Sequence, residues 1–193
     1  KLTTARQAVG VLSECLEAFG GAGYVEDTGL PALLRDGPVL SIWEGTTNVL
    51  SLDVLRAMGK GDALRCLTEE VTELTASLDD PRLADVGRRC RHAVARAATH
   101  AAALLDRAGK GAEAATEALG PLEASARRLA LTLGRSLAGA LLAGHAQWSL
   151  AHEGDGRARA AACRFAAHGV DLLDLDAPLD ESLALAGDAP LAG

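Results

Sequence analysis

Long stretches of helix-forming sequence, separated by short breaks, are the feature that most restricts the fold of this chain. Four such stretches follow one another after residue 61, namely Ala63–Leu78, Asp80–Ala108, Glu113–Glu153 and Arg157–Leu175. The breaks contain glycine, aspartate or proline, which favour turns and stop helices. Short connections between long helices favour antiparallel neighbours, so this part of the chain predicts an up-and-down bundle. Because proline disrupts a helix interior, the third helix is expected to begin or to kink at Gly120-Pro121.

The composition also predicts an all-α fold. Hydrophobic residues make up 49% of the chain, but only five residues are aromatic. Sheets favour β-branched and aromatic residues, whereas alanine and leucine, which dominate here, favour helices. No apolar run reaches the roughly 20 residues that a membrane span needs, and no secretory signal is present, so neither a membrane nor export is expected.

The net charge and the spacing of the cysteines argue against several classes of binding site. The formal net charge is −7, and residues 61–193 hold 14 basic and 19 acidic side chains, which argues against a nucleic-acid partner. The four cysteines are widely spaced and form no C-x-x-C pair, so neither a zinc site nor a disulfide framework is predicted. Reduced thiols fit a cytoplasmic protein best. The cysteines are Cys15, Cys66, Cys90 and Cys163.

The first 60 residues differ from the rest of the chain, because their predicted helices are shorter and they contain glycine-rich turns. Apolar residues recur at helical spacing from Ala5 to Phe19, and the glycines that follow are typical of a helix end. A short helix over Leu30–Arg35, a turn at 36–38 and an irregular segment over 39–44 are expected next. A further helix then runs from Thr46 or Thr47 to about Met58.

These differences predict three parts of the chain. Gly59-Lys60-Gly61 is the clearest joint, which separates residues 1–60 from an appended helical bundle at residues 61–176. Residues 177–193 carry scattered acids, prolines and glycines and are expected to fray. The sequence starts at Lys1-Leu2-Thr3 without a methionine, so we interpret it as a piece of a longer protein.

The segment Ser41-Ile42-Trp43-Glu44-Gly45-Thr46-Thr47-Asn48 carries the most chemical information. Glycine lets a ligand approach the backbone closely, and threonine and asparagine are good first residues of a helix. A helix start presents free N–H groups to electron-rich ligand atoms. A carboxylate beside such a site is placed to act as a general base. Taken alone, Glu44 could equally be an acid that stabilises the helix start.

Three elements of the first 60 residues together resemble the C-terminal helical domain of the acyl-CoA dehydrogenases. They are the runs Glu17-Ala18-Phe19-Gly20-Gly21-Ala22-Gly23-Tyr24, Leu34-Arg35-Asp36 and Ile42-Trp43-Glu44-Gly45-Thr46-Thr47-Asn48. Any one of them is a weak signal, but their order and gaps match the family. The tryptophan before the glutamate and the long helical extension are most similar to the alkylation-response flavoproteins. The extension itself shows no motif, so the resemblance covers about a third of the chain.

The resemblance implies roles for individual residues. Glu44 matches the catalytic base, Gly45 the position whose backbone lies against the substrate thioester, and Trp43 a wall of the pocket. The residues that match FAD-binding positions are Thr46, Thr47 and Asn48 beside the flavin, and Glu17, Ala18, Phe19, Gly20 and Gly21 at the adenosine diphosphate half, across a subunit interface. Many family members have glutamine in place of Glu17, so this carboxylate is expected to point away from the phosphates.

The implied reaction is the α,β-dehydrogenation of an acyl-CoA thioester, with Glu44 removing the α-proton. The implied partners are the acyl-CoA substrate, a second copy of the chain in a homo-oligomer, and an electron-transfer flavoprotein. Because the family holds its flavin between this domain and two others, the chain alone is expected to be inactive and to bind no FAD. Three alternatives stay open: an acyl-CoA oxidase, an alkylation-response flavoprotein, and a non-catalytic helical oligomerisation module.

Other candidate residues are weaker. His92 and His100, and His145 and His152, could each share a helix face, but no further ligands complete a metal sphere, so no metal is predicted. Arg35-Asp36 is interpreted as a structural ion pair or cap. Tyr24 is expected to pack and to donate its hydroxyl locally.

Overall fold

A computed structural model of the chain describes residues 1–176 and 178–187. In this part of the chain every regular element is helical, which confirms the predicted all-α fold. The elements, in chain order, are α1 Leu2–Glu17, α2 Gly21–Tyr24, η1 Glu26–Thr28, α3 Leu30–Asp36, η2 Gly37–Ser41, α4 Thr47–Met58, α5 Ala63–Leu74, α6 Pro81–Ala108, α7 Ala112–His152, α8 Arg157–Ala167 and α9 Leu179–Ala186, where η1 and η2 are 3-10 helices.

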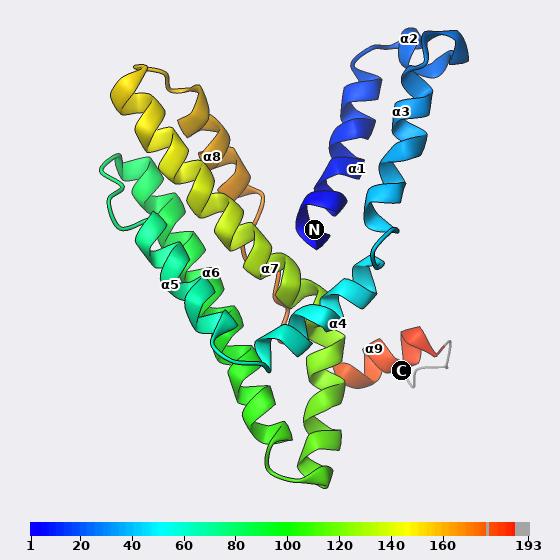
Figure 1. Ribbon diagram of the computed structural model, residues 1–193, viewed down its shortest axis with the longest axis vertical. Coiled ribbons are helices and arrows are strands. Elements are labelled where there is room, and N and C mark those ends of the chain that lie inside the picture. The colour runs from blue at the N-terminus through cyan, green and yellow to red at the C-terminus, as the bar shows by residue number, and fades with distance from the viewer. Residues whose placement is uncertain (177, 188–193) are drawn as a thin grey trace.

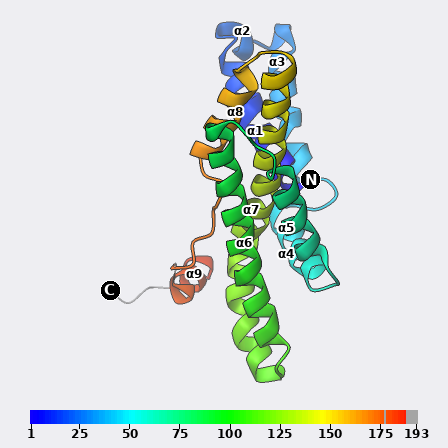
Figure 2. The ribbon, with the colours of Figure 1, turned by 90° about the vertical axis from the view of Figure 1, so that its left-hand side faces the viewer.

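These elements form two arms of a V (Figure 1). The small arm contains residues 1–41, from α1 to η2, and the large arm contains α5 to α8, residues 63–167. Helix α4 joins the arms and packs on α7. Figure 2 shows α6 and α7 side by side, with α8 on one side of them and α4 and α5 on the other. Within the described residues, no helix has both the length and the apolarity that crossing a membrane requires.

The large arm is the predicted up-and-down bundle, and small residues let its central pair approach closely. Ala93, Ala97 and Ala101 of α6 and Ala140 and Ala143 of α7 are all buried. A Cβ added at Gly139 of α7 would lie only 2.6 Å from Cys90 Sγ of α6. Because interiors pack as tightly as crystals, such a contact leaves no room for a larger side chain. Burial also raises the pKa of the Cys90 thiol to about 11.

Polar contacts fix the turn between α5 and α6 against the rest of the large arm. Asp80 accepts hydrogen bonds from the backbone N–H groups of Arg82 (2.9 Å) and Leu83 (3.1 Å), which caps α6. The same carboxylate forms an ion pair with Arg159 of α8 at 2.9 Å. These hydrogen bonds hold the pKa of Asp80 below its ordinary value, and the bond from Arg159 has the largest effect. Gln147 of α7 accepts from the N–H groups of residues 79 and 80 at 3.1 Å.

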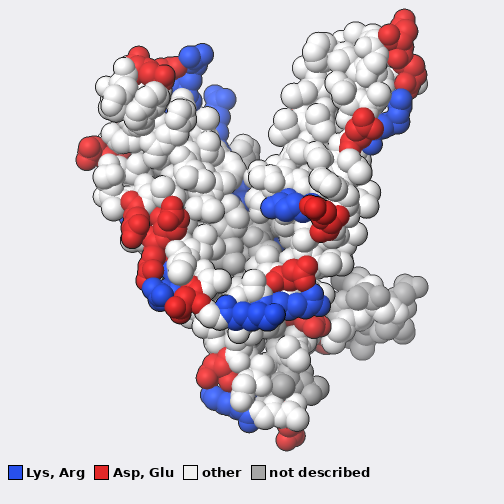
Figure 3. Space-filling model, viewed as in Figure 1, with Lys and Arg blue, Asp and Glu red and all other residues white. Residues whose placement is uncertain are grey.

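The two arms meet at the base of the V and separate above it. A Cβ on Gly134 of α7 would lie 2.0 Å from Thr3 Oγ1 of α1, so the helices touch there. Further up lies an open groove of about 980 Å³, lined by apolar side chains such as Val11 of α1, Leu141 of α7 and Phe165 of α8. Figure 3 shows this hollow, whose walls carry few charged side chains.

Tertiary contacts end two helices earlier than the sequence predicts. Helix α8 stops at Ala167 rather than at Leu175. Three side chains of α6 and α7 hold the segment that follows in a non-helical path: Arg135 donates to Gly169 O (2.6 Å), Arg96 donates to Leu173 O (2.6 Å), and Thr132 accepts from Leu172 N–H (2.9 Å).

Helix α5 ends at Leu74 rather than at Leu78 for a similar reason. The guanidinium of Arg91 on α6 donates to both the hydroxyl (2.6 Å) and the carbonyl (3.2 Å) of Thr75. Side-chain donors of this kind satisfy carbonyls that a helix end leaves free. The local pattern at residues 75–78 is thus overruled by a neighbouring helix.

Two further segments differ from their predictions. Residues 37–41 form the 3-10 helix η2 instead of a turn followed by an irregular segment. Helix α7 runs without a break through Pro121, so it does not begin there, and Figure 1 shows that this helix bends along its length. The tail, expected to fray from residue 177, instead contains α9, which packs on α7. Residues 177 and 188–193 of that tail lie outside the described residues.

Candidate functional site: an acidic loop and a glycine turn

The segment predicted to carry the general base forms a loop between η2 and α4. Glu44 has φ +55°, and it is the one non-glycine residue with positive φ among the residues that the structure describes. Such a backbone costs an ordinary residue roughly 1–2 kcal/mol relative to its favoured conformations. Its side chain is exposed. Within the described residues, its carboxylate and its backbone N–H make no hydrogen bond or ion pair. Both groups are therefore without a partner in this part of the chain.

The backbone of the loop itself explains why residue 45 is a glycine. Its φ is +109°, a conformation that side-chain-bearing residues rarely adopt. An added Cβ would also come within 3.1 Å of Leu50 Cδ2. The resemblance to the family relates this glycine to the approach of a thioester. The structure shows that the turn into α4 needs a glycine here even before a ligand is considered.

The start of α4 offers donors that no side chain among the described residues uses. Thr46 is the N-cap residue, with extended backbone, and its hydroxyl makes no capping hydrogen bond. The first N–H groups of a helix have no partner within the helix, so they are available to a ligand. Thr46 and Asn48 are exposed and Thr47 is half-buried. The three predicted flavin-contacting residues are thus grouped at one helix end beside Glu44.

Lys1 was not among the residues that the sequence singled out, yet it contacts this loop directly. Its Nζ donates hydrogen bonds to the backbone carbonyl of Trp43 and, at 2.9 Å, to that of Gly45. These are the carbonyls of the residues on either side of Glu44. The contact spans 42 and 44 residues of sequence, so no local pattern announces it.

The predicted adenosine diphosphate contact forms a turn at the other end of α1. Gly20 has φ +57°, and its N–H donates to Glu17 O at 2.9 Å. A Cβ on Gly23 would lie 2.3 Å from Leu16 O, so close packing requires that glycine. A Cβ on Gly21, in contrast, would meet nothing within 4 Å. The chain itself gives no reason for Gly21, whereas a ligand approaching the backbone would give one.

The two parts of the predicted site are not brought together. Helix α1 has 16 residues and is therefore roughly 24 Å long. The loop with Glu44 lies beside its first residue, and the turn with Gly20 lies beyond its last (Figure 1). The two groups therefore lie near opposite ends of α1.

Several aromatic side chains of the small arm and of the loop that follows it are unexpectedly exposed. The exposed fraction is 86% for Tyr24, 59% for Phe19 and 56% for Trp43. The interpretation of Tyr24 as a packed residue with a local hydrogen bond is therefore wrong. Trp43 faces a shallow pocket of about 280 Å³ that it shares with Lys1 and Leu40. Arg35 pairs with Glu26 through two hydrogen bonds of 2.8 and 3.1 Å, and not with its neighbour Asp36.

The histidines take part in local contacts. Among the described residues, no group of three or more His, Cys, Asp or Glu side chains could hold a metal ion. His145, Trp148 and His152 stack along α7, with ring centroids 5.9 and 5.1 Å apart. His100 Nε2 lies 3.1 Å from Ser125 Oγ, and burial, with a smaller effect of Arg96, lowers the pKa of His100.

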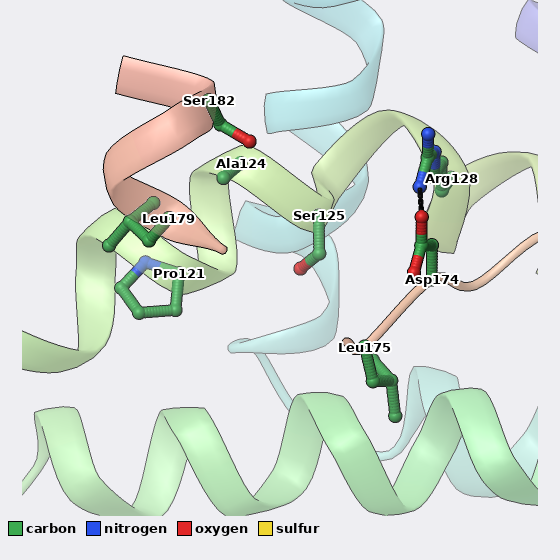
Figure 4. A pocket seen from close by; sticks show the side chains of 8 residues that line it. All are labelled: Pro121, Ala124, Ser125, Arg128, Asp174, Leu175, Leu179 and Ser182. Atoms are coloured by element: carbon green, nitrogen blue, oxygen red, sulfur yellow. Dashed lines mark hydrogen bonds and ion pairs between the residues drawn. The ribbon is translucent and has the colours of Figure 1, made fainter. Parts of the chain in front are cut away.

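Ser125 also lines a pocket of about 230 Å³ between α7 and α9 (Figure 4). Its hydroxyl donates to Leu122 O at 3.1 Å, so it is not poised to give its proton to His100. Arg128 and Asp174 form an ion pair of 2.7 Å across the pocket. These polar groups satisfy one another, and the pocket shows no arrangement for catalysis.

Comparison with known proteins extends the resemblance to almost the whole chain. Residues 1–59 match the model of the acyl-CoA dehydrogenase C-terminal domain, and residues 62–179 match that of the acyl-CoA dehydrogenase 11 C-terminal domain-like family. The fold and the loop thus define a C-terminal helical region of an acyl-CoA dehydrogenase. The chain belongs to the acyl-CoA dehydrogenase family, and its appended bundle, which showed no motif, has a family of its own.

Individual relatives agree with this assignment. Acyl-CoA dehydrogenase family member 11 of Caenorhabditis elegans is 42% identical over 159 residues, which is 80% of this chain and 25% of that protein. Putative acyl-CoA dehydrogenase AidB of Escherichia coli (strain K12) is 43% identical over 60 residues, 31% of this chain and 11% of that protein. The predicted likeness to the alkylation-response branch is therefore supported in the first third of the chain.

A solved structure shows the same fold. The crystal structure of C. elegans ACDH-11 in complex with C11-CoA matches 100% of this chain with a TM-score of 0.82 and 34% identity. The chain covers 32% of that protein, and about a quarter of the length of the relative from the same organism.

Proposed function

We propose that this chain works as the C-terminal part of a longer, FAD-dependent acyl-CoA dehydrogenase that converts an acyl-CoA thioester into its trans-2-enoyl product. One observation carries the proposal. Glu44, exposed and without a partner among the described residues, is held in a left-handed backbone conformation directly before an uncapped helix start. Strained residues of this kind are found mainly at functional sites, where surrounding contacts maintain them.

In this proposal the carboxylate of Glu44 removes the proton from the α-carbon of the thioester. The charge that develops on the thioester carbonyl oxygen needs hydrogen-bond donors, and the free N–H of Glu44 is one. Losing a single such donor typically costs an enzyme roughly 3–4 kcal/mol of transition-state stabilisation. Gly45 keeps the backbone open beside the thioester, and Trp43 contributes a wall of the site. FAD, when bound, accepts the hydride that leaves the β-carbon.

The residues fit such a cofactor in two separate places. Thr46, Thr47 and Asn48 offer hydroxyl, amide and backbone donors at the start of α4 to the flavin. At the other end of α1, the open space over Gly21 suits the adenosine diphosphate half. The residues of this second place are Glu17, Ala18, Phe19, Gly20 and Gly21.

The resemblance to the family implies that a complete site uses two copies of the chain. The two groups lie at opposite ends of α1, which is roughly 24 Å long, and in this proposal the glycine turn of one copy serves the cofactor held at the loop of another. The exposed side chains of Phe19 and Tyr24 at the tip of the small arm support a contact there. We therefore propose a homo-oligomer. Residues 1–60 supply the site, and the bundle at residues 61–176 supports it.

The family and the C11-CoA complex of ACDH-11 support the choice of substrate class. We propose an acyl-CoA thioester as the substrate, an electron-transfer flavoprotein as the electron acceptor, and the cytoplasm as the compartment.

The test uses the full-length protein that contains this chain, mixed anaerobically with a panel of acyl-CoA thioesters while flavin absorbance is recorded. We expect bleaching, slowed at least ~100-fold by Glu44→Gln because the general base is lost. The flavin content should stay unchanged. Glu73→Gln on α5, an equally exposed glutamate far from the loop in sequence, is the matched control.

The outcomes separate the alternatives. Bound flavin that no thioester bleaches would overturn the dehydrogenase assignment and favour an alkylation-response role. Bleaching that survives Glu44→Gln would remove Glu44 as the base. Rapid reoxidation by air with formation of peroxide would identify an oxidase, and absence of flavin would favour a helical oligomerisation module.

A further inference from the structure

The ammonium group of Lys1 joins the two peptide groups that surround Glu44. Its Nζ donates to the carbonyl oxygens of Trp43 and Gly45, the latter at 2.9 Å. Among the described residues, the ammonium group of Lys1 contacts no carboxylate. The start of α1 is thereby tied to the strained part of the loop.

These contacts determine the direction of the donors on the loop. In a planar trans peptide the C=O and the N–H point to opposite sides, and no cis peptide occurs in the described residues. A Trp43 carbonyl directed at Lys1 therefore sends the N–H of Glu44 away from Lys1. The Gly45 carbonyl does the same for the N–H of Thr46. Within the described part of the chain, neither N–H group donates a hydrogen bond.

We propose that Lys1 is a positioning residue of the dehydrogenase site, which holds the Glu44 backbone in its left-handed conformation and strengthens the Glu44 N–H as a donor to the thioester oxygen. The inference rests on the function proposed above. A hydrogen bond from a cation to a carbonyl is stronger than a neutral one, and it polarises the N–H of the same peptide. In this role Lys1 acts through the backbone on either side of Glu44.

The test compares Lys1→Ala with Lys60→Ala in the full-length flavoprotein. Lys60 is exposed and makes no side-chain contact among the described residues. Lys60→Ala therefore removes the same charge as Lys1→Ala without removing a contact. For Lys1→Ala we expect kcat for flavin reduction to fall about 10- to 100-fold, which is less than the loss of a whole oxyanion donor. KM should change less than about threefold, because the substrate contacts remain. Flavin content and Tm should equal those of Lys60→Ala.

Chemical rescue distinguishes positioning from a general role in stability. Added n-butylammonium supplies a cation on a four-carbon chain, and we expect it to restore part of the kcat of Lys1→Ala. Uncharged n-butanol should not. An unchanged kcat in Lys1→Ala, or a kcat lost together with flavin and Tm and not restored by the amine, would overturn the proposal.

Amide hydrogen exchange separates this proposal from the proposed function. Peptides that cover residues 42–47 should exchange faster in Lys1→Ala than in Lys60→Ala, whatever the reaction is. If the wild-type flavin is never reduced by a thioester, the dehydrogenase function and the catalytic part of this proposal both fail. Faster exchange would then still show that Lys1 positions the loop, and unchanged exchange would overturn that as well.

Discussion

The two arms of the molecule place their apolar side chains in opposite ways. In the large arm, the side chains of Leu83, Leu122 and Leu129 are almost completely shielded from solvent. In the small arm, those of Val11, Phe19 and Leu33 are more than half exposed. The large arm therefore contains the core that stabilises the chain.

This difference indicates what each arm contributes. An exposed apolar surface of this extent on a helical arm marks a contact with another domain, another chain or a ligand. The small arm carries the glycine turn and leads directly into the Glu44 loop, and its exposed side chains are available for contacts outside the chain. The large arm gives it a rigid attachment through α4 and through the Thr3–Gly134 contact.

The largest expected effect comes from removing core volume in the large arm. Leu129→Ala should lower the free energy of unfolding by ~2–5 kcal/mol, because a fully buried leucine leaves a cavity. Leu33→Ala in the small arm removes the same atoms from a 57% exposed side chain, and its effect should stay within ~0.5 kcal/mol. Urea denaturation followed by circular dichroism measures both. Equal losses would show that the arms share one core.

A smaller effect is expected from the pH dependence of stability. The pKa of Asp80 is lowered in the folded state, so its contribution is present above the ordinary aspartate pKa and is lost as pH falls through the lowered value. Asp80→Asn should therefore reduce stability at pH 7 and flatten the decrease between pH 7 and pH 3. Urea midpoints at several pH values measure this.

The matched variant for that prediction lies in the small arm. Arg35 lowers the pKa of Glu26, as Arg159 lowers that of Asp80, but the side chains of Arg35 and Glu26 are both more than 60% exposed. Exposed pairs contribute little, so Glu26→Gln should leave both the midpoint at pH 7 and its pH dependence unchanged. A flattening as large as that of Asp80→Asn would contradict the contrast between the arms.

The smallest effect on stability is expected at the glycine turn. Gly21→Ala should leave Tm unchanged, because the added Cβ meets nothing within 4 Å. In the full-length protein the same variant should lower the fraction of molecules that carry FAD. Gly23→Ala, whose Cβ would meet Leu16 O at 2.3 Å, is the contrasting variant and should disturb the turn itself. Undiminished FAD in Gly21→Ala would remove the turn from the proposed site.

The sequence predicted those helices whose ends are determined locally. Helix α6 starts after Asp80, an N-cap residue followed by proline, and α3 and α4 also begin where expected. The ends of α5 and α8 were wrong by four and eight residues, since Leu78 and Leu175 were predicted where Leu74 and Ala167 are found. Arginines on neighbouring helices cause both differences, and contacts between distant residues are not visible in a local pattern.

Some features of the candidate site could likewise be predicted from local sequence, whereas others could not. The run from Trp43 to Asn48 and its resemblance to a family could be recognised from residue types and spacing. The left-handed conformation of Glu44, the contact from Lys1 and the separation of the two groups along α1 could not. Each depends on how segments more than 15 residues apart meet after folding. The exposure of Tyr24 and Phe19 depends on the same arrangement.

The length of α1 has a genetic consequence. If each complete site takes its Glu44 loop from one chain and its glycine turn from another, defects at opposite ends of α1 are complementary. Mixed oligomers of a Glu44 variant and a glycine-turn variant would contain some sites built from two intact halves. Two inactive alleles would then restore partial activity when expressed together, whereas two alleles altered at the same end would not.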